Sequence, residues 1–515
     1  MDLLIRGATL YDGTGGPARR ADVAVTGSRI EAVGDEAATA GADRAGVNRA
    51  GARRAGVDRA GIEIDGRGLA LAPGFIDVHS HDDFAVFLMP DMDFKLAQGV
   101  TTDVVGNCGL GAAPFGPARR YLGFFGADHQ EAALPSWDTY GEYLDAVDAR
   151  PPSLNVAVLV GHGTVRLDAM GNERRAPSAP EMARMLDTLA EGLEAGCVGY
   201  STGLIYEPGR YCESDELVSL ARLMSGTGAV YASHMRNEAE HLLDAVAETI
   251  AIGEEGGVPV QISHHKASGT SAWGMVKGSL AMIEEARARG VDVTADQYPY
   301  TAGSTSLFAV LQNYEEGTAG VGAVDWSRIV LASAPRHPDL EGRSVAALAA
   351  ASGVDPVEAA RRTVDAEGYG AVVVIHSMSE DDVRTVMAHP STMIGSDGIP
   401  TVGGKPHPRL YGTFARVLGH YARDEALLTL EAAVHRMTGM PAAKFGLEGR
   451  GVIEPGAWAD LVLFDPATIA DVATYEAPRR HAAGIRGVWV NGTAVVRDGV
   501  HTGERPGRAL RRGRS

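Results

Sequence analysis

The sequence predicts an α/β protein in which a (β/α)8 barrel carries a small β-sandwich domain built from both chain ends. Short apolar runs, such as 156–160, 258–262 and 372–375, alternate with longer stretches whose apolar residues recur at helical spacing. Buried strands that alternate with helices imply βα units and a parallel sheet, and the length given to them suits a barrel. Strand-and-turn texture at both termini predicts a second, smaller sheet.

The predicted domains follow the chain in order. Residues 448–502 are expected to complete the sheet that residues 1–71 begin, and 307–364 are loosely patterned, as a lid over the barrel would be. An Ala/Gly/Arg-rich stretch is expected to be a solvated loop, with a partner-binding arm as the alternative. The expected boundaries are 1–71 with the insertion 37–61, 72–447 for the barrel with the possible lid 307–364, 448–502, and a flexible tail at 503–515.

Composition narrows the function classes. The chain has 515 residues and a formal charge of −19, which argues against binding nucleic acid or anionic lipid. The first residues lack the apolar core of a signal peptide, and no apolar run approaches the ~18 residues of a membrane span. Three cysteines are too few for a disulfide framework, so we expect a cytoplasmic protein. The oligomeric state stays open.

The first chemical signal is a pair of histidines, His79 and His81, at the end of an apolar run. Side chains alternate along a strand, so the two imidazoles point to the same side. At the carboxyl end of a barrel strand, that side is the mouth where active sites form. Taken alone, such a pair is more often two exposed loop histidines.

Other metal-binding side chains follow other apolar runs. They are Cys108, His234, His264 with its neighbour His265, and Asp397. Imidazole, thiolate and carboxylate are the groups that Zn²⁺ accepts. Asp397 alone reads as a turn aspartate before Gly398, but its company favours a metal site with catalytic function. Four other residues are weaker candidates, because a structural role is at least as expected for each as a functional one: His162, His376, Cys197 and Cys212.

Several longer motifs extend over nearly the whole chain. They include 73–83 (Pro-Gly-Phe-Ile-Asp-Val-His-Ser-His-Asp-Asp), 106–109 (Gly-Asn-Cys-Gly), 233–238 (Ser-His-Met-Arg-Asn-Glu) and 262–266 (Ile-Ser-His-His-Lys). With these motifs the sequence resembles the amidohydrolase superfamily, and within it the N-acyl-D-amino-acid deacylases, or D-aminoacylases. The resemblance implies zinc-dependent hydrolysis of N-acyl-D-amino acids, or of dipeptides that end in a D-residue.

The resemblance also implies roles for individual residues. Cys108, His234 and His264 would hold a tightly bound zinc ion, and His79, His81 and Asp397 a weaker second one. Asp397 would act as general base and then general acid. The residues that would hold the substrate carboxylate are Lys266, Tyr298, Ser304 and Arg409. His264 rather than His265 is preferred as ligand by alignment alone, and D-selectivity rests on the resemblance alone.

Two other functions remain open from the sequence. A cyclic-amide hydrolase of the hydantoinase or dihydroorotase kind often bridges two metals with a carbamylated lysine on the fourth strand, and residues 196–204 offer no lysine. A non-catalytic scaffold with the same fold would be expected to have lost ligands, and this chain keeps them all.

Overall fold

The structure is a computed structural model that describes residues 1–37, 61–317 and 324–513. Its centre is a barrel of parallel strands in the order β16-β12-β11-β10-β9-β8-β7-β6. The strands are β6 (Phe75–Asp77), β7 (Val100–Val105), β8 (Asn155–Gly161), β9 (Gly199–Gly203), β10 (Val230–His234), β11 (Val260–Ile262), β12 (Val293–Gln297) and β16 (Thr392–Ile394). The predicted (β/α)8 barrel is confirmed.

The barrel closes where its first and last strands meet. A parallel bridge joins Ser80 to Gly398, and the backbone N–H of Asp397 donates to the carbonyl of His79 at 2.7 Å. Behind this seam the buried Lys95 ammonium lies 2.5 Å from Asp77 Oδ2 and 3.1 Å from Ser396 Oγ. Asp77 Oδ1 in turn accepts the backbone N–H of Ser396 at 2.8 Å. These contacts fix the strand ends that carry His79 and Asp397.

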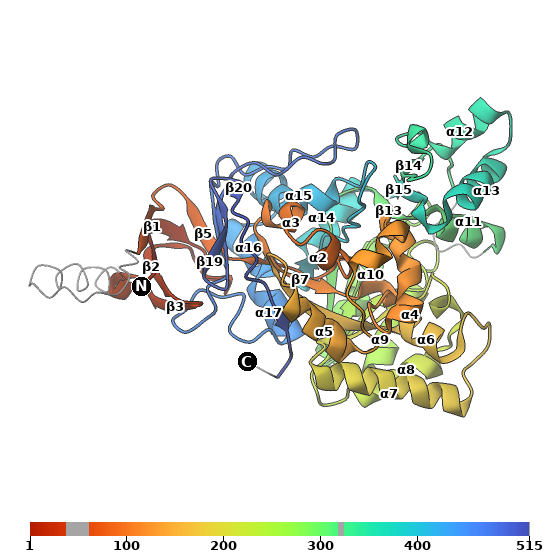
Figure 1. Ribbon diagram of the computed structural model, residues 1–515, viewed down its shortest axis with the longest axis horizontal. Coiled ribbons are helices and arrows are strands. Elements are labelled where there is room, and N and C mark those ends of the chain that lie inside the picture. Colours follow the sequence, from red (N-terminus) through yellow and green to blue (C-terminus); the bar gives the residue numbers. More distant parts are fainter. Residues whose placement is uncertain (38–60, 318–323, 514–515) are drawn as a thin grey trace, which may run out of the picture.

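Helices surround the barrel (Figure 1). The stretch 180–192, whose apolar residues recur at helical spacing, lies in α7 (Ala179–Ala195). This helix begins at a Ser178–Glu181 capping box and ends before Gly196, whose φ is 109°. It buries Met185 and Leu189. The other helices are α2 (Ala85–Leu88), α3 (Asp93–Leu96), α4 (Phe115–Ala118), α5 (Tyr140–Ala149), α6 (His162–Met170), α8 (Ser214–Leu223), α9 (Leu242–Gly256), α10 (Val276–Ala288), α14 (Glu380–Ala388), α15 (Arg409–Arg416), the π-helix Val417–Asp424, α16 (Leu430–Met437) and α17 (Gly439–Phe445).

Both chain ends build the second sheet, as predicted. Its order is β20-β19-β18-β17-β5-β1-β2-β3, and β4 pairs with β1. Leu461 and Leu463 of β17 face the small core of this sheet, whereas Val462 and Phe464 face the barrel core. The strands are β1 (Leu3–Leu10), β2 (Arg19–Thr26), β3 (Arg29–Val33), β4 (Ile62–Asp65), β5 (Ala70–Pro73), β17 (Leu461–Phe464), β18 (Ile485–Val490), β19 (Thr493–Arg497) and β20 (Val500–His501).

An insert with its own apolar core follows β12 and lies at the far end of the molecule from the small sheet (Figure 1). Its three-stranded sheet has the order β13-β15-β14. The elements are β13 (Gly303–Ser306), α11 (Leu307–Glu315), β14 (Ile329–Ser333), α12 (Val345–Ser352), α13 (Pro356–Glu367) and β15 (Val372–Ile375). The prediction that 372–375 is a barrel strand was therefore wrong: the run is buried, but its partners are β13 and β14.

The C-terminal segment is also ordered more than expected. β21 (Ala509–Leu510) adds to the barrel beside β8, and Arg511 pairs with Asp145 at 2.6 Å. The prediction of a flexible tail over 503–515 is wrong for residues 507–512, because backbone hydrogen bonds to the barrel hold this segment. Almost all of the Ala/Gly/Arg-rich stretch 37–61 lies outside the described residues.

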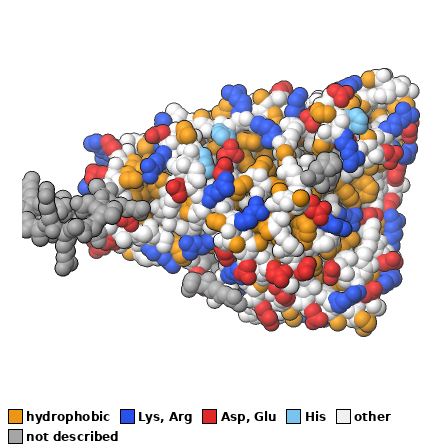
Figure 2. Space-filling view, in the orientation of Figure 1, with side chains coloured by type: hydrophobic (Ala, Val, Ile, Leu, Met, Phe, Trp, Pro, Cys, Tyr) orange, Lys and Arg blue, Asp and Glu red, His pale blue; other side chains and the backbone are white. Residues whose placement is uncertain are grey.

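The described surface carries both signs of charge, and acidic side chains gather along the edge where Figure 1 places α5 and α7 (Figure 2). All three cysteines are free and buried. Among the described helices, none combines the length and the apolar character needed to cross a membrane.

Candidate metal centre

The predicted metal ligands meet at the carboxyl ends of the barrel strands. His79 follows β6, Cys108 lies in a short 3-10 turn after β7, His234 ends β10, His264 follows β11 and Asp397 follows β16. His81 lies beside them, and each of these six residues is at most 6% exposed. Groups far apart in the chain therefore share one buried site.

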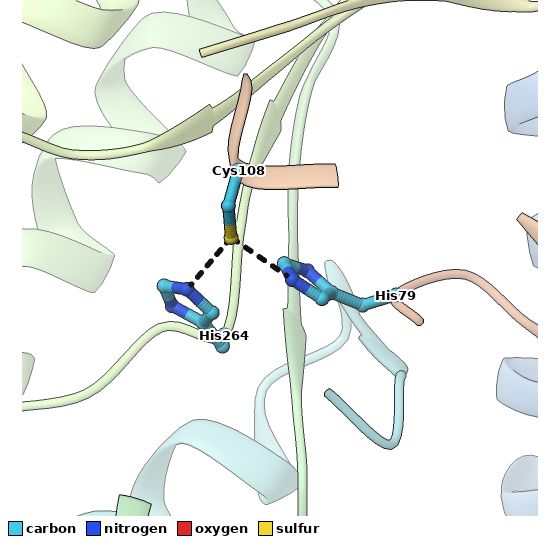
Figure 3. A group of neighbouring side chains, drawn as sticks. All are labelled: His79, Cys108 and His264. Carbon is cyan, nitrogen blue, oxygen red and sulfur yellow. Dashed lines mark hydrogen bonds between the residues drawn. The ribbon is translucent and has the colours of Figure 1, made fainter. Parts of the chain in front are cut away.

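Cys108 lies between His79 and His264 (Figure 3). Its Sγ is 3.4 Å from His79 Nε2, 3.5 Å from His264 Nε2 and 3.6 Å from His234 Nδ1. Burial alone would raise the pKa of the thiol, but the charges of His79 and His264 hold it well below its ordinary value. The sulfur is therefore set to act as a thiolate, which is the form that binds metals.

Asp397 forms the second half of the cluster. Its Oδ1 lies 3.1 Å from His81 Nε2 and 3.5 Å from His79 Nε2, and its Oδ2 lies 2.8 Å from Arg409 Nη1. Burial would raise the pKa of this carboxyl, but Arg409 and then His264 lower it well below its usual range. Asp397 is held as a carboxylate.

The backbone is strained at three members of the cluster. Cys108, His264 and Asp397 have φ values of 55°, 35° and 50°. A non-glycine residue in this left-handed region costs about 1–3 kcal/mol, and such residues gather at functional sites. The fold holds these side chains in position at the expense of local backbone preference.

The donor atoms fit a zinc ion. Zn–S and Zn–N bonds of about 2.3 and 2.0–2.1 Å at a tetrahedral angle put sulfur and nitrogen about 3.5 Å apart, and the distances from Cys108 are 3.4–3.6 Å. His264 Nε2 also lies 2.8 Å from His234 Nδ1, so a ring nitrogen of each histidine lies next to the sulfur. A soft thiolate and borderline imidazole ligands that converge on one point are typical of a zinc site.

Two carboxylates that we did not single out from the sequence orient the histidines. Asp296 Oδ1 lies 3.2 Å from His79 Nδ1 and accepts the backbone N–H of His264 at 2.7 Å. Glu238 Oε1 lies 3.0 Å from His264 Nδ1. Such partners fix the ring orientation of metal-binding histidines. A carboxylate shortly after the predicted strand 291–294 was the available signal for Asp296, and Glu238 ends the 233–238 motif.

His264, and not His265, belongs to the cluster. His265 points toward α10, where its Nε2 lies 2.8 Å from Ser279 Oγ. Burial, and then the charge of Lys266, lowers the pKa of His265 to about 4. The choice that alignment alone suggested agrees with this geometry.

The predicted substrate residues lie beside the cluster. Lys266, Tyr298 and Ser304 line a cavity that runs from His81, His234, His264 and Asp397 to the insert. Arg409 is fully buried, stacks 4.4 Å from the Tyr298 ring centre and donates to the Ser304 carbonyl at 3.3 Å. The Lys266 ammonium is already paired with Glu238 at 2.6 Å, which the sequence did not indicate.

The remaining candidates lie outside the cluster. His162 Nε2 lies 2.7 Å from Glu216 Oε1, which also accepts from Arg166 Nε at 3.1 Å, so this histidine has a structural hydrogen-bond partner. Cys212 is close to that pair, but burial raises the pKa of its thiol to about 12. The thiol of Cys212 therefore stays protonated. The guanidinium groups of Arg166 and Arg236 also lie close to it, and these positive charges disfavour a metal ion there.

Known proteins resemble the chain along its whole length. The Amidohydrolase family matches residues 63–496. A D-aminoacylase from Alcaligenes xylosoxydans xylosoxydans is 42% identical over 99% of this chain and 98% of its own. An N-acyl-D-glutamate deacylase from the same organism is 43% identical over 99% and 97%.

A solved structure agrees. The crystal structure of N-acyl-D-glutamate deacylase from Bordetella bronchiseptica, complexed with zinc and a phosphonate mimic of the tetrahedral intermediate, covers 99% of both chains at 41% identity and a TM-score of 0.85. This similarity agrees with the barrel, with the sheet built from both chain ends and with the cluster of metal-binding side chains. The chain belongs to the amidohydrolase family, in the branch of the D-aminoacylases.

Proposed function

We propose that this protein is a zinc-dependent hydrolase of the linear amide bond in N-acyl-D-amino acids, or in dipeptides with a C-terminal D-residue. Its products are a carboxylate and the free D-amino acid. The observation that carries the proposal is the convergence of a thiolate and three imidazoles on one buried centre, with Asp397 beside them. Similarity of at least 40% to three deacylases named for D-amino acids supports the substrate class.

In this proposal Cys108, His234 and His264 hold one zinc ion tightly. His79, His81 and Asp397 form a weaker companion site, and the Cys108 sulfur lies between the two groups. A bound zinc ion polarises the scissile carbonyl and makes a water molecule more acidic. A solved structure of a D-aminoacylase concerns a binuclear metal centre in which one metal activates and a second attenuates, and this supports a centre with two sites.

Asp397 is the proposed proton carrier. Arg409 keeps it ionised, so it can accept a proton from the attacking water. The same carboxyl then gives that proton to the departing amine, which otherwise leaves as a strongly basic anion. The carboxylate is buried, so bulk water does not compete for this proton.

The substrate carboxylate is proposed to bind Lys266, Tyr298, Ser304 and Arg409. The buried Tyr298 hydroxyl has no hydrogen-bond partner among the described residues, although it lines the cavity. A donor left free in this way is suited to an incoming anion. Arg409 supplies a planar guanidinium 4.4 Å from the centre of the Tyr298 ring.

The alternatives have less support. β9 carries no lysine that could bridge two metals, as cyclic-amide hydrolases often require. A non-catalytic scaffold has no reason to keep strained ligands in a buried cluster. The cytoplasmic location, the absence of nucleic-acid and membrane partners, and the oligomeric state stay predictions or open questions.

The test is turnover of N-acetyl-D-amino acids beside their L-forms, with the metal content measured on the same sample. We expect release of free D-amino acid, loss of activity on chelation and recovery with zinc. Inactivity toward all D-substrates by zinc-loaded protein contradicts the proposal, as does full activity after complete removal of metal. Faster ring opening of a hydantoin would favour the cyclic-amide alternative.

A further inference from the structure

The wall of the cavity furthest from the metal cluster comes from the insert and carries a single carboxylate. Helix α11 follows directly from Ser304 in β13 and presents Phe308 and Gln312, which are one turn apart, to the cavity. Glu207, on the loop after β9, completes this wall. Its side chain is 9% exposed.

Glu207 is held in place by several donors. Gln312 Nε2 and the Tyr211 hydroxyl both donate to its Oε1, and Asn172 Nδ2 donates to its Oε2 at 2.6 Å. Burial would raise the pKa of this carboxyl, but these hydrogen bonds hold it below its ordinary value. The exposed Arg174 guanidinium also lies 3.5 Å from Glu207 Oε1, outside the cavity lining, so Glu207 is a fixed carboxylate at neutral pH that has no cation on its cavity side among the described residues.

Among the residues that the structure describes, the cavity lining offers no free cation to balance a second carboxylate. Among the described lining residues Lys266 is the only lysine or arginine, and its ammonium contacts Glu238 at 2.6 Å. Arg409 already faces Asp397. Arg120 stands behind the wall, where it donates to the Tyr369 hydroxyl at 2.5 Å and does not line the cavity.

The amino-acid side chain is the part of the substrate that meets this wall. In the proposed function the substrate carboxylate lies at Tyr298 and Ser304, and the side chain shares its Cα with that carboxylate. It must therefore lie within a few ångströms of Ser304, next to α11. The rest of the lining there is uncharged, and it mixes apolar side chains such as Ile205, Phe308 and Ile375 with the hydroxyls of Thr305 and Ser306.

We propose that this enzyme selects N-acyl-D-amino acids with uncharged, apolar side chains, and that Glu207, positioned by Gln312, rejects acidic ones. The inference rests on the proposed function and adds the substrate class. A carboxylate brought into this wall would lose its hydration and meet a like charge, with no cation to replace the water.

The experiment compares kcat/KM for N-acetyl-D-leucine and N-acetyl-D-glutamate in zinc-loaded enzyme. We expect leucine to be favoured by about 100-fold, the size of effect that a buried, unpaired charge produces in a specificity pocket. Glu207→Gln should raise kcat/KM for the glutamate substrate about 10-fold relative to that for the leucine substrate. Adding Gln312→Arg to it should raise the glutamate value further, because a cation then faces the substrate.

Glu316→Gln is the matched control. Glu316 also lies within reach of Gln312, at 3.5 Å, and pairs with Arg174 at 3.0 Å, but it does not line the cavity. This variant should leave the leucine-to-glutamate ratio unchanged. Circular dichroism and zinc content show whether each variant is folded.

A second substrate separates the side chain from the acyl group. N-succinyl-D-leucine carries its extra charge on the acyl side, and Glu207→Gln should not improve its turnover. If the variant improves this substrate instead of N-acetyl-D-glutamate, the assignment of the wall to the side chain is overturned.

The two proposals fail differently. Equal or faster turnover of N-acetyl-D-glutamate by the unaltered enzyme, or an unchanged ratio in Glu207→Gln, overturns the selectivity alone. Inactivity of zinc-loaded enzyme toward every N-acyl-D-amino acid overturns the proposed function and the selectivity with it.

Discussion

Replacement of Asp296 by asparagine or alanine tests the support of the metal centre. One oxygen of this 1% exposed carboxylate accepts the His264 backbone N–H at 2.7 Å and lies 3.2 Å from His79 Nδ1. The other accepts from Gln261 Nε2 at 2.8 Å. A single side chain therefore orients two of the proposed zinc ligands, although it is not itself a ligand.

The expected loss of zinc affinity depends on which of the Asp296 contacts each replacement retains. Asparagine has the same shape, and its oxygen can take over both contacts to the histidines as neutral hydrogen bonds. Its amide group then faces the Gln261 amide, whose oxygen already accepts from Thr294 at 2.5 Å. Charge-assisted bonds are about twice as strong as neutral ones, so we expect zinc affinity to fall about 10-fold, the lower end of the ~10–100-fold range for such partners.

Alanine removes all three acceptor contacts. Each buried donor left without a partner costs about 1–3 kcal/mol. We therefore expect Asp296→Ala to weaken zinc binding by about 100-fold or more and to lower the free energy of unfolding by about 3 kcal/mol or more.

Competition with a chromophoric chelator measures the zinc affinity, and chemical denaturation measures stability. Asp292→Asn is the control, because Asp292 directly precedes the same strand, β12, but pairs with Lys444 at 3.0 Å, away from the cluster. If both Asp296 variants bind zinc as tightly as the unaltered protein, Asp296 does not orient the ligands and the reasoning fails.

Three further changes probe proton transfer, the barrel seam and a buried lysine. Asp397→Asn should lower kcat by about 10²–10⁴-fold while the tight zinc is retained; metal analysis and kinetics check this, and a loss under tenfold would remove its proton-transfer role. Lys95→Met leaves Asp77 and its buried acidic neighbours without their cation and should cost about 3–5 kcal/mol of unfolding free energy; an unchanged denaturation midpoint would count against a structural role for the seam. Burial lowers the pKa of Lys444 to about 8 from 10.5, so the unfolded chain binds more protons between those pH values and the stability contributed by this group rises with pH there. Relative to Lys444→Met, the unaltered protein should thus gain about 2.5 kcal/mol from pH 8 to 10.5, and a constant difference would show that the lysine titrates normally.

Local sequence sufficed for much of the architecture. Period-2 and period-3.6 patterns mark each strand or helix through the burial of one face, so the barrel and the two-ended sheet could be predicted. The same patterns do not specify pairing partners. For this reason 372–375 was assigned to the barrel although it pairs in the insert, and 503–515 was expected to be free although β21 adds to β8.

The metal site, too, could be predicted from the sequence only in part. Ligand types after apolar runs were visible along the chain, because parallel strands bring their carboxyl ends to one face. Which of His264 and His265 faces the sulfur, which carboxylates orient the histidines, and how Glu207 meets Gln312 were not visible. Those relations join residues on different elements at distances of a few ångströms, and long-range packing sets such distances whereas local periodicity does not.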